Sequence, residues 1–239
     1  MDASELYDPE FRKLIKSKEP TIIIPVGSLE QHGAHLPVTT DSDIVTEIAS
    51  RLAKKCGFIV FPTISYGVSF EHSPLFNTST SDGNLTQSLW NILLSLIKNK
   101  IRSIIILNGH HGNIEALDLF MCSHKLQYPT PKEFQGAKVR CYSYWHFMKH
   151  EFDHAGFVET SLMLAISDKV KMKKAKKGLI TKGLSEKERK RINKLSTQPG
   201  GFPKVAKNGV WGDPTGATKK DGEKFLAEII RNLAKECQS

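Results

Sequence analysis

The sequence has the length and composition of one α/β domain, with 239 residues of which 39% are hydrophobic and 25% charged, enough to bury a core without disulfides. No apolar run approaches the roughly 20 residues that a transmembrane helix requires, and the polar, acidic start of the chain does not have the pattern of a signal peptide. The net charge of +9 suggests an anionic partner, unless the charge is confined to one segment.

The first half of the chain predicts strands and helices in alternation. The apolar, β-branched run 20–27 (PTIIIPVG) is typical of a strand buried on both faces, and 58–64 (FIVFPTI) predicts the next strand. Between them, residues 41–57 have apolar residues at helical spacing, begin with Asp and Ser caps, and end at Gly57. Residues 82–100 repeat this helical pattern.

The second half continues in the same way. Residues 101–109 (IRSIIILNG) predict a third buried strand, followed by a helix over 113–127. Residues 137–145 (AKVRCYSYW) predict a fourth strand, and 159–167 (ETSLMLAIS) a short helix. Residues 209–236 predict a loop and then a final amphipathic helix.

This order of elements predicts an α/β fold with a mainly parallel sheet and helices on both faces. We find no internal repeat and no linker, so we predict a single domain over 1–239, with a basic, irregular insertion at about 169–208. The cysteines form no CxxC pair, and we expect reduced thiols and a cytoplasmic protein. They are Cys56, Cys122, Cys141 and Cys237.

The basic charge lies almost entirely between Lys169 and Lys194. This window has twelve Lys and Arg residues against Glu186 and Glu188, a net charge of +10, so the rest of the chain sums to about −1. One interpretation is a solvated insertion, and the other is a surface that attracts an anionic ligand or nucleic acid. No aromatic residue lies between the lysines, which argues against single-strand binding.

Ligand-type side chains follow the predicted strands. The stretches 27–43 (GSLEQHGAHLPVTTDSD) and 108–113 (NGHHGN) begin where apolar strands end, and 153–161 (DHAGFVETS) adds a histidine and a glutamate. Taken singly, each has a structural explanation: a hydrogen-bonded histidine, an N-cap at Asp41, or a carboxylate at a helix start for Glu159. Together at one sheet edge, they favour a divalent metal site with mixed nitrogen and oxygen ligands.

Four motifs in this order resemble the creatininase family of amidohydrolases. They are PVGSLEQHGAHLPVTTDSD, NGHHGN, HAGFVETS and GVWGDPTGAT, which together span residues 25–218. The resemblance implies a three-layer α/β sandwich with a two-metal site at the carboxyl ends of the strands. It also implies a homo-oligomer, often a hexamer.

The resemblance assigns a role to individual residues. Asp41 matches the carboxylate that bridges both ions, and His154 the histidine that handles protons. Gly112 departs from relatives that carry an acidic ligand at this position, which makes Glu159 the expected carboxylate of the second site. The ions implied are Zn, Fe(II) or Mn. The positions that match metal ligands are Glu30, His32, Asp41, His110 and Glu159.

The loop 66–83 (YGVSFEHSPLFNTSTSDG) is expected to shape the substrate pocket. It is close to the family pattern EHxxFPGT, but Phe76 and Asn77 replace Pro and Gly. From the motifs we expect three substrate-binding residues, namely His72, Thr78 and His111.

The expected chemistry is hydrolysis of a non-peptide amide, in which two ions activate a shared water and His154 protonates the leaving amine. The family includes creatinine amidohydrolases, archaeal deformylases of a formamidopyrimidine ribonucleotide in flavin and deazaflavin biosynthesis, and enzymes that trim a peptide. The compact, Lys-rich chain favours the phosphorylated formamide. Creatinine or another cyclic amide is the alternative, and a non-catalytic metal-binding or basic nucleic-acid-binding protein is the alternative of another class.

Overall fold

The protein is built around a parallel sheet, as predicted. The computed structural model describes residues 1–126 and 136–238. Four strands pair in the order β3-β1-β5-β6, and every pairing in this sheet is parallel. The strand predicted over 58–64 is much shorter in the structure, because only Ile59 and Val60 pair with β1. The strands are β1 (Thr21–Val26), β3 (Ile59–Val60), β5 (Ser103–Asn108) and β6 (Lys138–Ser143).

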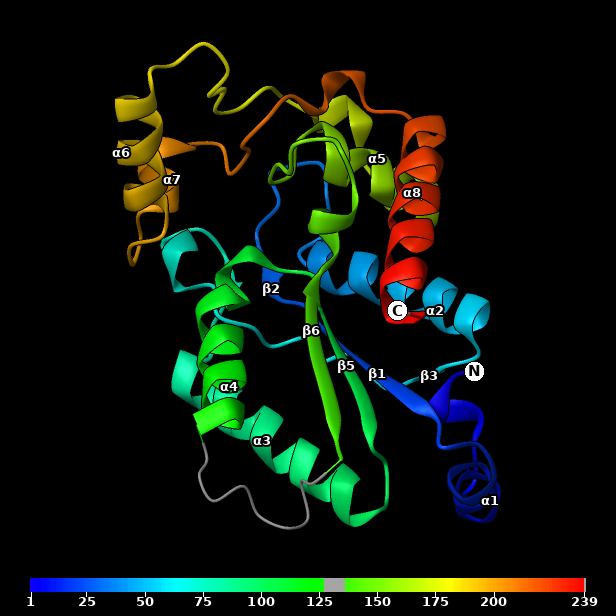
Figure 1. Ribbon diagram of the computed structural model, residues 1–239. Helices are drawn as coiled ribbons and strands as arrows, with labels where there is room; N and C mark the ends of the chain where they lie inside the picture. Colours follow the sequence, from blue (N-terminus) through cyan, green and yellow to red (C-terminus); the bar gives the residue numbers. More distant parts are fainter. Residues whose placement is uncertain (127–135, 239) are drawn as a thin grey trace.

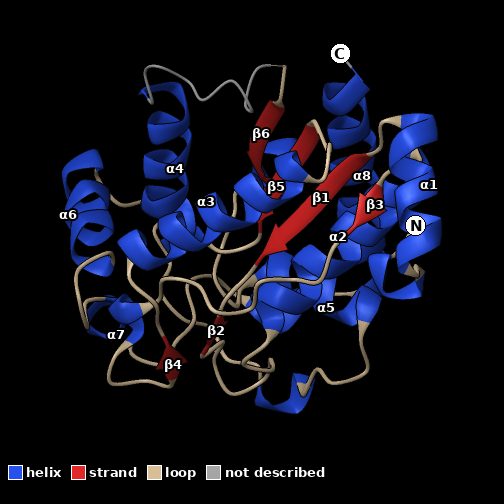
Figure 2. Ribbon diagram, turned by 90° about the horizontal axis from the view of Figure 1, so that it is seen from below, coloured by secondary structure: helices blue, strands red, loops and turns tan. Residues whose placement is uncertain are grey.

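Helices cover both faces of the sheet, which confirms the three-layer architecture (Figures 1 and 2). On one face pack α2 (Thr40–Cys56), α5 (Phe157–Ile166) and α8 (Lys219–Gln238). On the other pack α3 (Asp82–Lys98) and α4 (Ile114–Leu126). Residue 127, the predicted end of the helix that forms α4, lies outside the described residues. Of the described helices, none is both long and apolar enough to cross a membrane.

The two central strands supply both cores because successive side chains of a strand point to opposite faces. Ile23 and Ile105 belong to the core under α2, α5 and α8. Ile22 and Ile104 belong to the core under α3 and α4. This explains why both strands read as uninterrupted apolar runs.

Two helices of eleven residues each and one short helix were not predicted from the sequence. The first is α1 (Asp8–Lys18), whose half-buried Phe11 packs against the core under α3 and α4. The other is α6 (Glu186–Ser196), so the prediction of an irregular insertion is wrong over these residues. Ser185 and Glu188 form a capping box at its start, and this signal is present in the sequence. Its few apolar residues concealed the helical period. A further short helix, α7 (Phe202–Val205), follows.

A small antiparallel pair connects the carboxyl end of the main sheet to the loop predicted to shape the substrate pocket. Strand β2 (Leu29–Glu30) pairs with β4 (Asn77–Thr78), in the register Leu29 to Thr78 and Glu30 to Asn77. This pairing brings the loop of residues 66–83 beside the first motif. Short 3-10 helices fill the connections: η1 (Ala3–Glu5), η2 (Phe70–His72), η3 (His111–Asn113), η5 (Tyr144–Phe147), η6 (Met172–Lys174) and η7 (Pro214–Gly216).

Candidate metal centre

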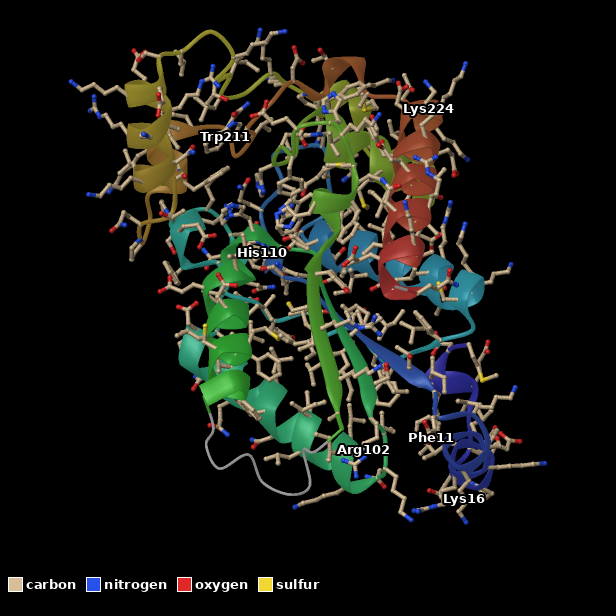
Figure 3. The ribbon with its side chains drawn as sticks, in the orientation of Figure 1. Phe11, Lys16, Arg102, His110, Trp211 and Lys224 are labelled. Carbon is tan, nitrogen blue, oxygen red and sulfur yellow. The ribbon has the colours of Figure 1, made fainter. Side chains whose placement is uncertain are left out.

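The structure brings the five predicted ligand residues together beyond the carboxyl ends of β1 and β5. They come from β2, the segment after it, the first turn of α2, the segment after β5, and the first turn of α5. His110, labelled in Figure 3, lies near the middle of the molecule. None of the five is more than 3% exposed: Glu30, His32, Asp41, His110 and Glu159.

His32 presents one ring nitrogen to carboxylates and the other to the backbone. Its Nε2 lies 3.2 Å from Asp41 Oδ1 and 3.5 Å from Glu159 Oε2. Its Nδ1 lies 3.2 Å from the carbonyl oxygen of Glu30. A carbonyl can only accept, so Nδ1 keeps its proton, and Nε2 is the nitrogen that can lose a proton and bind a metal ion.

His110 repeats this arrangement on the other side of Asp41. Its Nδ1 lies 3.0 Å from Asp41 Oδ2, and its Nε2 lies 2.8 Å from the carbonyl oxygen of Val68. Each oxygen of the Asp41 carboxylate therefore faces a different histidine. Glu30 Oε2 lies 3.2 Å from His110 Nε2.

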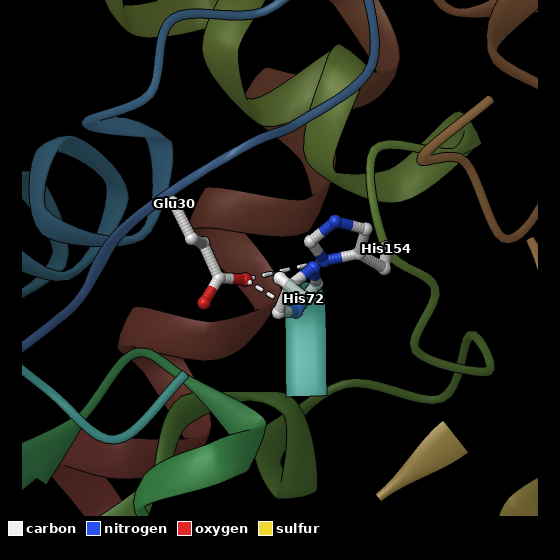
Figure 4. Close-up of side chains that lie close together, drawn as sticks. All are labelled: Glu30, His72 and His154. Carbon is white, nitrogen blue, oxygen red and sulfur yellow. Dashed lines mark ion pairs between the residues drawn. The ribbon is translucent and has the colours of Figure 1, made fainter. Parts of the chain in front are cut away.

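Two residues of the loop 66–83 also reach the cluster. His72 Nε2 lies 3.1 Å from Glu30 Oε1, and Figure 4 shows this contact together with His154, whose Nδ1 lies 3.7 Å from the same oxygen. Glu71 Oε1 lies 3.8 Å from both His72 Nε2 and His110 Nε2. The sequence analysis placed Glu71 in the pocket loop but not in the metal cluster. The pairing of β2 with β4, which brings the loop to the cluster, could not be predicted because each strand has only two residues.

The other two predicted substrate-binding residues lie outside this cluster. Thr78 is half-buried in β4, and its hydroxyl donates to the carbonyl oxygen of Leu29 at 3.4 Å. The ring of His111 stacks on Trp145 with 6.2 Å between the ring centroids. Trp145, which sequence reasoning did not single out, is the last residue of the predicted fourth strand and lies in η5 in the structure.

Gly112 has no room for a larger residue in this arrangement. A Cβ atom at this position would overlap the carbonyl oxygen of Val68 and would lie 2.5 Å from His110 Nε2. The position where some relatives carry an acidic ligand is thus closed by the backbone and by His110. Glu159, the carboxylate that the resemblance assigns to the second site, lies beside His32.

Burial and mutual attraction shift the pKa values in this cluster. Burial alone would lower the pKa of His32, but the carboxylates of Asp41, Glu159 and Glu30 raise it to about 10. The pKa of His110 is likewise raised against the effect of burial, by Glu30 and Asp41. Burial raises the pKa of Glu159. Protons thus compensate the buried carboxylates when no other cation is present.

The donor set fits divalent metal ions. Among the described residues, Glu30 Oε1 and Asp41 Oδ2 are buried and accept no hydrogen bond of good geometry, although histidine nitrogens lie 3.1 and 3.0 Å away. Such oxygens are costly to bury without a cation. Imidazole and carboxylate ligands in a closed, buried cluster suit Zn, Mn or Fe(II).

His154 differs from the other histidines in its surroundings. Its side chain is 15% exposed, and burial together with the neighbouring His32 and His72 lowers its pKa well below the usual value. Its ring also contacts Phe202 of α7, edge-on at a centroid distance of 4.8 Å. A neutral imidazole at the solvent side of the cluster can take up a proton.

A three-layer α/β fold with histidines and carboxylates gathered beyond the strand ends defines the class of metal-dependent hydrolases. Comparison with known proteins agrees: the family described as "Creatininase: Creatinine amidohydrolase" matches residues 4–237. The chain belongs to the creatininase family, and it is an amidohydrolase of that family. Family membership also favours an enzyme over the non-catalytic and nucleic-acid-binding alternatives.

Three relatives show the range of activities in the family. The chain is 32% identical over 229 residues to the mycofactocin precursor peptide peptidase of Mycolicibacterium smegmatis, which covers 92% of this chain and 85% of that protein. It is 30% identical over 189 residues to the creatinine amidohydrolase of Pseudomonas putida, covering 68% and 70%. It is 36% identical over 102 residues to the 2-amino-5-formylamino-6-ribosylaminopyrimidin-4(3H)-one 5'-monophosphate deformylase of Methanosphaera stadtmanae, covering 40% and 43%.

Solved structures of creatininases share the fold. A creatininase mutant of the Zn-Zn type and a creatininase with Mn each match with a TM-score of 0.79 at 25% identity. Each match covers 98% of this chain and 96% of that chain.

Proposed function

We propose that this protein hydrolyses an amide C–N bond with two divalent metal ions held on either side of Asp41. The observation that carries the proposal is the Asp41 carboxylate, whose two oxygens face His32 Nε2 at 3.2 Å and His110 Nδ1 at 3.0 Å. A carboxylate placed between two imidazole nitrogens that can each exchange a proton for a metal ion is suited to hold two ions.

The remaining ligands divide between the two sides. His32, Asp41 and Glu159 would hold one ion, with Glu159 Oε2 steadied by the backbone N–H of Ala155 at 2.6 Å. His110 Nδ1 and Asp41 Oδ2 would hold the other. Glu30, which has a carboxylate oxygen close to ligand atoms of both His32 and Asp41, would complete the ligand set. When bound, the ions would polarise the amide carbonyl and lower the pKa of the attacking water.

His154 is the proposed proton carrier. Because its pKa is lowered, it is neutral near pH 7 and can accept the proton that water loses on attacking the carbonyl carbon. It then delivers this proton to the leaving nitrogen as the C–N bond breaks. The products are a carboxylic acid and an amine.

The proposed substrate is a formamide on a phosphorylated nucleotide, the reaction of the archaeal deformylases. The ring of Phe202 packs against two histidines of the cluster, 4.4 Å from the ring of His72 and 4.8 Å from that of His154 between centroids. A small acyl group such as formyl would suit a site crowded in this way. Lys204 and Lys207 are exposed beside Phe202, and their charge would suit a phosphate.

One relative favours a second candidate. The mycofactocin precursor peptide peptidase matches over 92% of this chain, whereas the deformylase matches over 40%. Peptide C–N hydrolysis at the same metal site is therefore the rival substrate class, ahead of creatinine. In either case, we propose His111 and Thr78 as residues of the substrate pocket and a homo-oligomeric, cytoplasmic enzyme.

The proposal is tested by measuring formate release from the formamidopyrimidine ribonucleotide by Zn-loaded and Mn-loaded protein. Creatinine, a mycofactocin precursor peptide and the dephosphorylated formamide nucleoside serve as comparison substrates. We expect formate release from the nucleotide, with the nucleoside poorer chiefly in KM because a remote phosphate contributes uniform binding. Hydrolysis of the peptide or of creatinine without formate from either formamide would contradict the deformylase assignment.

A further inference from the structure

Gln31 lies between two of the ligand candidates in sequence, yet its side chain contacts two other histidines. It is 8% exposed. Its side-chain nitrogen Nε2 lies 2.9 Å from His72 Nδ1 and 3.1 Å from His154 Nε2. The sequence offered no signal for this role, because the contacts reach loops 41 and 123 residues away along the chain.

The orientation of the Gln31 amide is fixed by its other end. The backbone N–H of Gly33 donates to Gln31 Oε1 at 3.0 Å, so Oε1 is the acceptor atom and the NH2 group faces the histidines. Gly209, with φ of +74°, closes against the same oxygen, where a Cβ atom would overlap it. A rotated amide would place an unpaired NH2 group against Gly33 N–H.

The NH2 group decides which nitrogen of His72 carries the proton. An amide NH2 can only donate, so Nδ1 of His72 accepts and has no hydrogen of its own. The proton of the neutral ring is then on Nε2, which faces Glu30 Oε1 at 3.1 Å. This is the reverse of His32 and His110, whose second nitrogens donate to backbone carbonyls.

Gln31 does not fix the tautomer of His154. Its Nε2 lies 3.1 Å from the Gln31 side-chain nitrogen and also 3.1 Å from the Gln31 carbonyl oxygen. A donor and an acceptor therefore both lie within reach of this nitrogen. Only His72 is limited to one arrangement.

We propose that Gln31 is a positioning residue that holds His72 in the Nε2–H tautomer, so that the side of the ring facing Glu30 carries an N–H and His72 stays outside the metal ligand set. The positive end of this N–H dipole attracts Glu30 Oε1, 3.1 Å away, and so orients the Glu30 carboxylate with Oε2 toward His110. Partners that orient a ligating carboxylate contribute about 10–100-fold to metal affinity. The effect on affinity rests on the proposed ligand role of Glu30, whereas the tautomer does not.

The tautomer is measured by two-bond ¹H–¹⁵N correlation NMR on Zn-loaded protein labelled with ¹⁵N-histidine. His72 signals are assigned from a His72→Asn variant. We expect an unprotonated, pyridine-type Nδ1 and a protonated Nε2 for His72. A protonated Nδ1, or an Nε2 that shows direct coordination to the ion, would overturn the inference whatever the turnover of the protein.

Two variants separate a directing role from space filling. Gln31→Glu can still accept from Gly33, but it presents an acceptor to His72 Nδ1, so this nitrogen should become protonated. Gln31→Met has a similar volume and no donor, and it should lower Zn affinity by about 10–100-fold. The matched control is Gln87→Met on the exposed surface of α3, with Zn affinity unchanged.

Each variant can also contradict the inference. An unprotonated His72 Nδ1 in Gln31→Glu would show that Gln31 does not set the tautomer. Zn affinity of Gln31→Met equal to that of the Gln87→Met control would show that Gln31 does not act on the metal site through His72 and Glu30. A correct tautomer in a protein with no amidohydrolase activity would leave this inference standing and remove the proposed function.

Discussion

The metal centre and helix α6 are both rich in charged side chains, but these side chains are buried in the centre and exposed on α6. In the centre, every carboxylate of the proposed ligand set is at most 2% exposed and faces a histidine. On α6, the pair Lys190–Glu186 is about four-fifths exposed on both sides, at 77% and 82%. Buried charge requires specific partners, whereas exposed charge is solvated by water. We therefore expect single changes to have large effects in the centre and small effects on α6.

The largest effect is expected from Asp41→Ala. Each oxygen of Asp41 faces a different histidine, so the loss of this carboxylate should remove both ions and abolish turnover. By contrast, His32→Ala should mainly weaken the binding of one ion. Elemental analysis of freshly loaded protein provides the measurement, with wild type expected to hold two ions per chain. A single ion that persists in Asp41→Ala would rule out the bridging role.

His154→Asn should come next. As a proton carrier that is not a ligand, it should lower kcat by roughly 10²–10⁴-fold and leave the metal content unchanged. Steady-state kinetics and elemental analysis of the same sample check both parts. Loss of metal in this variant would make His154 a ligand instead.

Metal binding should release protons from the centre. The pKa of His32 is about 10 without metal and that of His110 is also raised, so both rings are protonated at pH 7 and must lose a proton before they can ligate. Apparent affinity should rise with pH, by up to about tenfold per unit for each proton released. Titration calorimetry in buffers of different ionisation enthalpy counts the protons. Binding without proton release would contradict the charge state described here.

The smallest effect is expected on α6. Lys190→Ala removes an exposed i,i+4 pair with Glu186, which should change the free energy of unfolding by less than about 0.5 kcal/mol. Denaturant unfolding measures this change. The metal content should equal that of wild type, and a loss of metal on this substitution would show that the basic segment acts on the centre.

The sequence predicted most of the fold because its signals are local. The central residues of β1 and β5 are apolar, and ligand-type residues follow both strands closely in the sequence. The sequence therefore predicted that the site lies at the edge of the sheet where these strands end. The helix α6 was missed because charged residues hide its period, although its capping box at Ser185 and Glu188 is present in the sequence.

The finer structure of the centre could not be predicted, because it depends on contacts distant in sequence. His72 reaches Glu30 only because β2 pairs with β4, and strands of two residues leave no periodic pattern. The role of Gln31 depends on Gly33, Gly209 and two histidines that converge in space. The sequence could identify the residue types of the site, but it could not determine which nitrogen faces which oxygen.

Anomalous diffraction from crystals of the Mn-loaded protein tests the two-metal account most directly. We expect two peaks flanking the Asp41 carboxylate, one bound by His32 Nε2 and Glu159 and the other by His110 Nδ1, with His72 and His154 coordinating neither. A single peak, or a peak coordinated by His72, would contradict the account.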